Sequence, residues 1–309
     1  MNEEDKCENC GCEIHPCMPC EEVVMLNGNH TDYEYFQLLE DILRNGKWKS
    51  NRTGIKTLTV AGGMFQTEMD GGFPILTTKK VPFGLVASEL EFFIKGLSDK
   101  RWLQERNNHI WDEWCNPQKV PYGNDSTTKQ QMLNEPDLGN IYGVIWRGKS
   151  PNQNFDQLKY VVDTLKKDPS NRRILCSAWS PMDLSTQALP PCHVMWGVVV
   201  IENRLNLWWM QRSCCSGLGI PFNISSYALL LHLLSKESGL LEGTLTGFFA
   251  DLHIYENHVD KLKEQMNRTP KILPRIETSN WTSIFDWKYT DSKLIGYDPH
   301  PAIKMEIAV

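Results

Sequence analysis

Residues 189–215 read LPPCHVMWGVVVIENRLNLWWMQRSCC, which is the clearest strand pattern of the chain. The runs at 193–201 and 205–211 are rich in valine, leucine and tryptophan, which predicts two strands. Two prolines come directly before Cys192. The stretch therefore places Cys192 and His193 side by side at the start of a strand.

Further elements are expected on both sides of this stretch. Thr31 and Glu34 have capping-box spacing ahead of an apolar helical pattern that ends at Gly46. The run at 56–69 reads as strand with a turn at its two adjacent glycines, 62 and 63. The other expected elements are helices at 84–96, 155–167, 222–235 and 255–266, a strand at 173–179, and a polar, exposed insertion at 116–136. Strands and helices alternate without an internal repeat, which favours a layered α/β or α+β fold.

The composition is typical of one globular catalytic domain. The chain has 309 residues, of which 41% are hydrophobic, enough for one large core. Its formal net charge of -6 argues against duplex nucleic acid as a partner, because such proteins usually carry a basic surface. A long apolar run and a signal-peptide pattern are both lacking, so we expect no membrane partner and a cytoplasmic location. The expected division is an appendage at 1–30 and a catalytic domain at 31–309.

The appendage is rich in cysteine. It contains Cys7, Cys10, Cys12, Cys17 and Cys20. Two pairs with CxxC spacing could supply four thiolates to zinc. The six residues between these pairs are fewer than in most zinc loops, so a zinc knob and a metal-free cysteine-rich tail both stay open. Cys115, Cys176 and Cys214 are interpreted as packing residues.

Cys192 by itself allows two interpretations. A thiolate is a nucleophile and nearby cations lower the pKa of a thiol, but a free cysteine is also a common packing residue. Polar residues that suit a phosphate lie at predicted loops or strand ends: Arg52, Arg172, Arg173, Arg212 and Ser213. Guanidinium groups bind phosphate through two hydrogen bonds. Each arginine alone could be a solvated surface residue, whereas together, in an acidic chain, they favour a monophosphate site.

Two further polar residues stand out within apolar helices. Asn223 offers a donor and an acceptor that match the edge of a uracil ring, although it could also be the N-cap of its helix. Glu89 lies in the apolar helix at 84–96. A carboxylate there either faces solvent or serves as a general acid or base, because burial needs a partner or a function.

Six motifs follow one another along the chain: IWDEW at 110–114, DPSNRR at 168–173, PCH at 191–193, QRS at 211–213, LGIPFN at 218–223 and YDPHP at 297–301. In these motifs the chain resembles the thymidylate synthase and pyrimidine hydroxymethylase superfamily, and the resemblance covers 31–309. This resemblance implies a thymidylate synthase-like fold, a large mixed sheet with surrounding helices. It also implies a homodimer in which the sheets of two subunits pack face to face, with Arg172 and Arg173 crossing to the other subunit.

The resemblance also implies roles for individual residues. Cys192 would add to carbon 6 of dUMP, so that carbon 5 takes the one-carbon unit of 5,10-methylenetetrahydrofolate. The implied substrate-binding residues are Arg52, Arg172, Arg173, Arg212, Ser213, Asn223, His253 and Tyr255. Proton transfer would involve Glu89, Tyr142 and His193. The folate side would comprise Trp111, Trp114, Cys215, Gly219, Phe222 and Val309.

Several positions depart from the synthase pattern. Cys215 stands where synthases carry an aspartate that contacts folate, and Ile145 and Gly197 stand where they carry glutamines. The segment 88–93 reads SELEFF in place of HELLWF. Two short segments, Glu89-Leu90-Glu91 and Ile145-Trp146, are similar to the corresponding parts of phage deoxycytidylate hydroxymethylases. In this superfamily a hydride completes the reaction to dTMP, whereas water gives 5-hydroxymethyl-dUMP. The departures are interpreted as changes on the folate and water side that favour water.

The predicted function is therefore a deoxyuridylate hydroxymethylase. Asn223 favours uracil, because the phage enzymes that act on cytosine carry aspartate there. Two alternatives stay open. The intact C-terminal motif at 301–309 favours a divergent thymidylate synthase, because closing the site over folate excludes water. The lost carboxylate at Cys215 would also suit a non-catalytic nucleotide- or RNA-binding protein.

Overall fold

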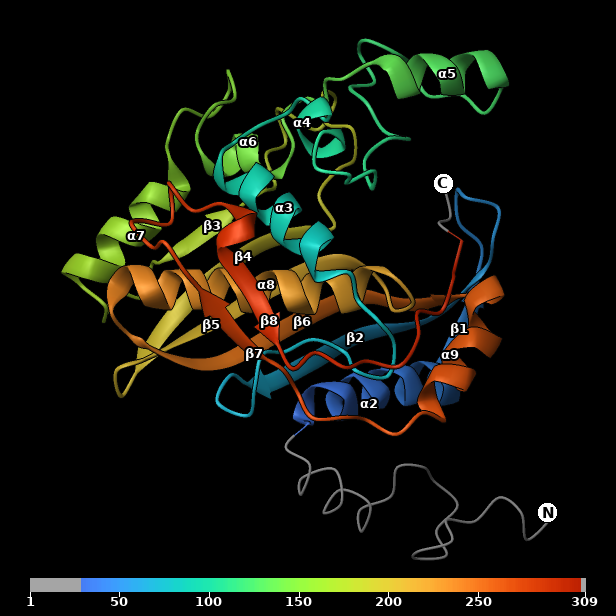
Figure 1. Cartoon of the computed structure of the whole chain (residues 1–309). Helices are drawn as coiled ribbons and strands as arrows, with labels where there is room; N and C mark the ends of the chain where they lie inside the picture. The colour runs from blue at the N-terminus through green and yellow to red at the C-terminus, as the bar shows by residue number, and fades with distance from the viewer. Residues whose placement is uncertain (1–28, 307–309) are drawn as a thin grey trace, which may run out of the picture.

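The computed structural model describes residues 29–306, and a six-stranded mixed sheet is its largest element (Figure 1). The helices are α2 (His30–Asn45), α3 (Phe83–Ile94), α4 (Arg101–Gln104), α5 (Ser126–Asn134), α6 (Tyr142–Trp146), α7 (Gln157–Lys167), α8 (Gly219–Ser238) and α9 (Val259–Met266), with 3-10 helices η2 (Glu256–His258) and η3 (Tyr289–Asp291). The strands are β1 (Lys47–Lys49), β2 (Thr57–Glu68), β3 (Leu175–Ser177), β4 (His193–Ile201), β5 (Arg204–Cys215), β6 (Leu241–Tyr255), β7 (Arg275–Thr278) and β8 (Ser292–Ile295).

The large sheet has the order β1-β2-β6-β5-β4-β3. Strands β5 and β6 pair in parallel, and the other neighbours pair antiparallel. The parallel pair needs a crossover connection, and α8 supplies it. Strands β7 and β8 form a separate two-stranded sheet. The expected mixed sheet with surrounding helices is confirmed.

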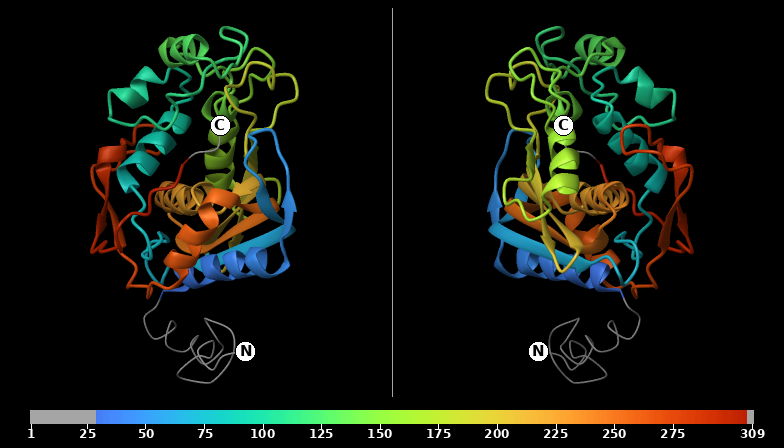
Figure 2. Two further views of the ribbon diagram at one scale, coloured as in Figure 1. Left: turned by 90° about the vertical axis from the view of Figure 1, so that its right-hand side faces the viewer. Right: turned by 90° about the vertical axis from the view of Figure 1, so that its left-hand side faces the viewer.

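The two faces of the sheet differ in character. Along β5, Leu207 and Trp209 are buried, while Met210 on the other face is exposed. Helix α8 packs on β5 and β6, and α2 packs on β2. Figure 2 shows α8 between the sheet and an outer layer that contains α3 and the β7–β8 sheet. The opposite face of the sheet carries exposed apolar residues and no covering helix from residues 29–306.

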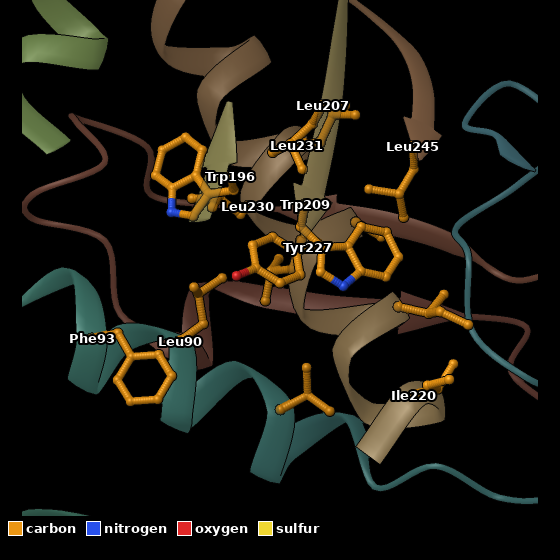
Figure 3. Packing of buried hydrophobic residues seen from close by; sticks show 14 of the residues in the cluster. Leu90, Phe93, Trp196, Leu207, Trp209, Ile220, Tyr227, Leu230, Leu231 and Leu245 are labelled. Carbon is orange, nitrogen blue, oxygen red and sulfur yellow. The ribbon is translucent and has the colours of Figure 1, made fainter. Parts of the chain in front are cut away.

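The core between the sheet and α8 is aromatic. Tyr227 of α8 stacks on Trp209 of β5, with ring centroids 5.2 Å apart and an interplanar angle of 14°. Figure 3 shows the ring of Tyr227 near that of Trp209, with Leu90 of α3 between Tyr227 and Phe93. Helix α8 is apolar nearly all round because it is covered by the sheet on one side and by α3 on the other.

Two local expectations are wrong. Helix α2 begins at His30, and its N-cap is Asn29, whose side chain accepts from the amide of Asp32, so Thr31 is not a cap. Strand β2 continues through both glycines without a turn. A Cβ at Gly63 would lie 2.7 Å from a methyl group of Leu252, so this glycine permits close packing instead.

The insertion at 116–136 contains a helix, α5, which Figure 1 shows projecting from the body of the molecule. The buried Lys100 lies beneath it. Its ammonium group donates to the backbone oxygens of Asp112, Trp114 and Met132, each at 2.8 Å. One lysine therefore ties the insertion to the segment that carries the tryptophans at 111 and 114.

The cysteines of the appendage lie outside the described residues. Within 29–306, Cys115, Cys176 and Cys214 are buried, as their interpretation as packing residues expects. The same part of the chain has no group of three metal-binding side chains placed to hold an ion. Among its helices, none combines the length and the apolar composition that crossing a bilayer requires.

Candidate active site

Cys192 lies directly before β4 and is partly exposed. Its amide donates to the hydroxyl oxygen of Tyr142 at 2.8 Å, and its carbonyl accepts from the amide of Arg212 at 2.8 Å. The side chain of Arg212 donates to the carbonyl oxygens of Pro190 and Pro191, each at 2.8 Å. The two prolines and Arg212 thus fix the backbone that presents the thiol.

The protonation of Cys192 reflects opposing effects. Burial raises the pKa of its thiol above the ordinary value, Arg212 lowers it, Cys215 raises it, and Arg52 lowers it. The arginines act in the direction expected for a nucleophile, but burial outweighs them in the free protein. Near neutral pH the sulfur is therefore mainly a thiol, whose reactivity should rise with pH.

His193 is held between two tyrosines. Its ring stacks on Tyr142, with centroids 4.1 Å apart, and its Nδ1 lies 2.7 Å from the hydroxyl of Tyr227. Burial lowers the pKa of His193 to about 3. The imidazole is therefore neutral at physiological pH, and Tyr227 fixes the orientation of its ring.

Glu89 is buried on α3, so the solvent-facing interpretation is wrong. Its Oε1 accepts from the indole Nε1 of Trp111 at 2.8 Å. Burial raises the pKa of Glu89 to about 7, and the bond from Trp111 acts in the opposite direction. A carboxyl group with a pKa near neutrality suits general acid and base catalysis.

Asn223 lies in the second turn of α8, so the N-cap interpretation is wrong. A Cβ built on Gly219 would lie 3.8 Å from the Oδ1 of Asn223, 3.8 Å from the Cβ of Cys215 and 3.9 Å from the Nε2 of Gln211. The side chains of Asn223, Cys215 and Gln211 therefore surround Gly219 as one cluster. Because Gly219 has no side chain, a flat ring could approach the backbone there.

His253 and Tyr255 lie at the end of β6. The Nδ1 of His253 is 2.9 Å from Oδ1 of Asp251, which is also paired with Lys49. The rings of His253 and Tyr255 meet edge to face at 5.2 Å. Asp251 thereby orients His253, and burial raises the pKa of Tyr255, which stays a neutral hydroxyl.

The predicted phosphate ligands lie in two separate places in the single chain. Arg52 and Arg212 act electrostatically on Cys192, and Ser213 follows Arg212 on β5. Arg172 and Arg173 are exposed on the segment that leads into β3. Their crossing to another subunit stays a prediction.

The predicted folate residues also differ in their placement. Trp111 and Trp114 are buried, and Phe222 is partly buried on α8. Val309 lies outside the described residues. The ring centroids of Trp111 and Tyr142 are 6.3 Å apart, so the residues predicted for folate lie next to those predicted for proton transfer.

Three of the departures from the synthase pattern do not belong to this side of the site. Glu91 is buried, accepts from the amide of Tyr289 at 2.8 Å and pairs with Lys95. Gly197 lies on the exposed face of the sheet, where a Cβ would be 2.6 Å from the ring of Trp208. Ile145 is packed in the core. Cys215 is therefore the substitution that bears most directly on the site.

Two positioning residues were missed by the sequence analysis. Tyr227 contacts His193 but lies in an apolar helix, where it looks like any core aromatic residue. Asp251 contacts His253. Residues two apart on a strand share a face, so this second pairing could have been found from the sequence.

The site brings together a partly exposed cysteine, two arginines that act on it electrostatically and a buried carboxyl group whose pKa is raised to about 7. A family model described as thymidylate synthase matches residues 33–309. The chain belongs to the thymidylate synthase family. Membership implies folate-dependent one-carbon transfer to dUMP.

Proposed function

We propose that this protein transfers one carbon to carbon 5 of dUMP through a covalent bond between Cys192 and carbon 6, and that water completes the product, 5-hydroxymethyl-dUMP. The observation that carries this choice of product is Cys215, which lies beside Gly219 and Asn223. Among the departures from the synthase pattern, Cys215 is the one that lies beside the residues predicted to bind folate.

The nucleotide half of the site supports dUMP as the substrate. Arg52 and Arg212 supply positive charge near the thiol for the phosphate. Asn223 can pair with both the N–H and the carbonyl of uracil. His253, oriented by Asp251, is available to the sugar hydroxyl. These groups bind and orient the nucleotide so that carbon 6 meets the sulfur.

Glu89 is the group that moves protons. When neutral it can protonate an oxygen or a water, and when ionised it can accept the proton from carbon 5 or from the attacking water. Its pKa near 7 allows both states in one reaction cycle. As the oxygen of water bonds to the exocyclic carbon, the bond from carbon 6 to Cys192 breaks and the thiolate leaves.

The folate donor supplies the one-carbon unit, and the residues at Trp111, Trp114 and Gly219 fit a flat ring. A carboxylate forms charge-assisted hydrogen bonds to ring N–H groups that are about twice as strong as neutral ones, whereas a thiol is a weak partner. Cys215 therefore holds the spent donor less tightly. The spent donor then leaves before it can transfer hydride, and water takes its place.

One observation favours the alternative, a thymidylate synthase. The C-terminal segment is anchored to the body of the protein, through contacts that include His258 to the carbonyl of Glu306 and Lys261 to that of Lys304. An ordered segment near the folate side would limit the access of water. The product therefore decides between the two functions.

The exposed face of the sheet supports a homodimer. Met64 of β2 and Met210 of β5 both pair with Phe248 of β6, and all three side chains are exposed. A second copy packed on this face would bury them, which is favourable for apolar surface. Arg172 and Arg173 precede β3 at the edge of the same sheet, from which they would reach the partner's phosphate site.

The test is to incubate the protein with dUMP and methylenetetrahydrofolate in oxygen-18 water, and to identify the nucleotide by mass spectrometry while absorbance follows dihydrofolate. We expect labelled 5-hydroxymethyl-dUMP without dihydrofolate. The matched variant Cys215→Asp restores the carboxylate and should shift the product toward dTMP. Equal amounts of dTMP and dihydrofolate from the unaltered protein would establish the synthase instead.

A further inference from the structure

The turn that follows Cys215 is held by hydrogen bonds and close packing contacts. The hydroxyl of the buried Tyr35 donates to the carbonyl of Ser216 at 2.8 Å, and the ammonium group of Lys79 donates to the carbonyl of Gly217. A Cβ at Gly217 would lie 2.7 Å from Nδ1 of His258 and 2.9 Å from the sulfur of Met305. The absence of a side chain at Gly217 therefore lets a histidine and the C-terminal segment pack directly on this turn.

His258 makes one hydrogen bond that determines its tautomer. Its ring is fully buried, and its Nε2 lies 2.8 Å from the backbone oxygen of Glu306. A carbonyl oxygen only accepts, so Nε2 carries the hydrogen. The other nitrogen, Nδ1, is buried without a hydrogen-bond partner among the described residues and faces Gly217. The hydrogen bond to Glu306 is therefore the one polar contact of this ring within the described residues.

The surroundings of His258 favour its neutral form. Burial lowers its pKa most, the hydrogen bond to Glu306 raises it, the charges of Lys261 and Lys79 lower it, and the Glu306 carboxylate raises it. Tyr255 completes the contacts, with ring centroids 5.6 Å apart. The net lowering keeps the imidazole uncharged at neutral pH, as a single donor to the chain end.

We propose that His258 is a positioning residue that docks the C-terminal segment, at Met305 and Glu306, against the turn that carries Cys215. Figure 1 shows this segment passing α9 on its way to the chain end. His258 contacts Tyr255, which is predicted to bind the sugar, and it also packs on Gly217, two residues after Cys215. Docking then brings the last described residues against the folate side, where they limit the freedom of the donor. The effect on the reaction rests on the proposed function, whereas the docking itself does not.

The test compares three full-length variants with the unaltered protein. His258→Leu removes the donor, and His258→Gln keeps an N–H group near the position of Nε2. The matched control is His300→Leu, which removes a partly exposed histidine whose Nε2 contacts the carbonyl of Thr269 instead. Carboxypeptidase digestion without any substrate, followed by mass spectrometry, measures how fast residues 305 and 306 are released.

We expect release from His258→Leu to be about three- to tenfold faster, the equivalent of one lost hydrogen bond, with His258→Gln and His300→Leu close to the unaltered protein. In the active enzyme, KM for the folate donor should rise in His258→Leu while KM for dUMP stays constant. If His258→Leu does not fold, Gly217→Ala tests the same contact, because its Cβ pushes Met305 away. Unchanged release from whichever variant folds would overturn the proposal, even if the protein proves to make dTMP.

Discussion

Glu89→Gln tests the buried carboxyl group on which the proposed proton transfer depends. Burial raises the pKa of Glu89 from 4.5 to about 7. A carboxyl whose pKa is raised by folding contributes stability that is complete below pH 4.5 and is lost as the pH rises through 7. At 1.36 kcal/mol per pH unit, the difference is about 3 kcal/mol in total, of which about 2.5 kcal/mol is lost between pH 5 and pH 8.

The assay is urea unfolding of the unaltered protein and of Glu89→Gln at pH 5 and pH 8. From pH 5 to pH 8, the unfolding free energy of the unaltered protein should fall by about 2.5 kcal/mol more than that of Glu89→Gln, since glutamine does not ionise. Glu68→Gln, which removes an exposed carboxylate on β2, should behave like the unaltered protein. The same pH dependence in Glu89→Gln and the unaltered protein would refute the raised pKa and, with it, the assignment of Glu89 as the proton carrier.

Three other substitutions give separate results. Arg212→Met removes the main charge that lowers the pKa of Cys192, so alkylation of this thiol at pH 8 should slow, as measured by mass spectrometry of the Cys192 peptide. Lys100→Met leaves three backbone oxygens without their donor, which should lower the unfolding free energy by about 3 kcal/mol in urea titrations. Asn223→Asp should shift turnover from dUMP toward dCMP, because a protonated carboxyl can donate to the ring nitrogen that cytosine leaves unprotonated; unchanged preference would remove Asn223 from base recognition.

The two strands at 193–201 and 205–211 were predicted well because their pattern is local, whereas β6 (Leu241–Tyr255) in the middle of the sheet was not predicted. The run at 193–201 matches β4 to the residue, and alternating burial along β5 follows from side chains that point to opposite faces. The start of α8 was missed by three residues. Pro221 lies inside the helix, because a proline is tolerated in the first turn, where its missing N–H has no partner. That error placed Asn223 at a cap that it does not occupy.

The sequence analysis named most residues of the site, but it did not predict the contacts between them. The segment around Glu89 was interpreted as one patch of altered residues, but Glu91 lies two residues farther along a helix. Two residues rotate a helix by about 200°, so the two carboxylates point in nearly opposite directions. Contacts such as His193 with Tyr227, or His258 with Glu306, join residues far apart in the sequence. The folded chain brings these residues together.

The central claim is that Cys192 forms a covalent bond to a pyrimidine nucleotide, and intact-protein mass spectrometry tests it most directly. The protein is mixed with 5-fluoro-dUMP and methylenetetrahydrofolate, alone and as Cys192→Ser, and the modified peptide is sequenced. The account predicts an adduct that contains one nucleotide and one folate, that maps to Cys192 and that is absent from Cys192→Ser. A protein that binds the nucleotide without an adduct, or an adduct that persists in Cys192→Ser, would contradict it.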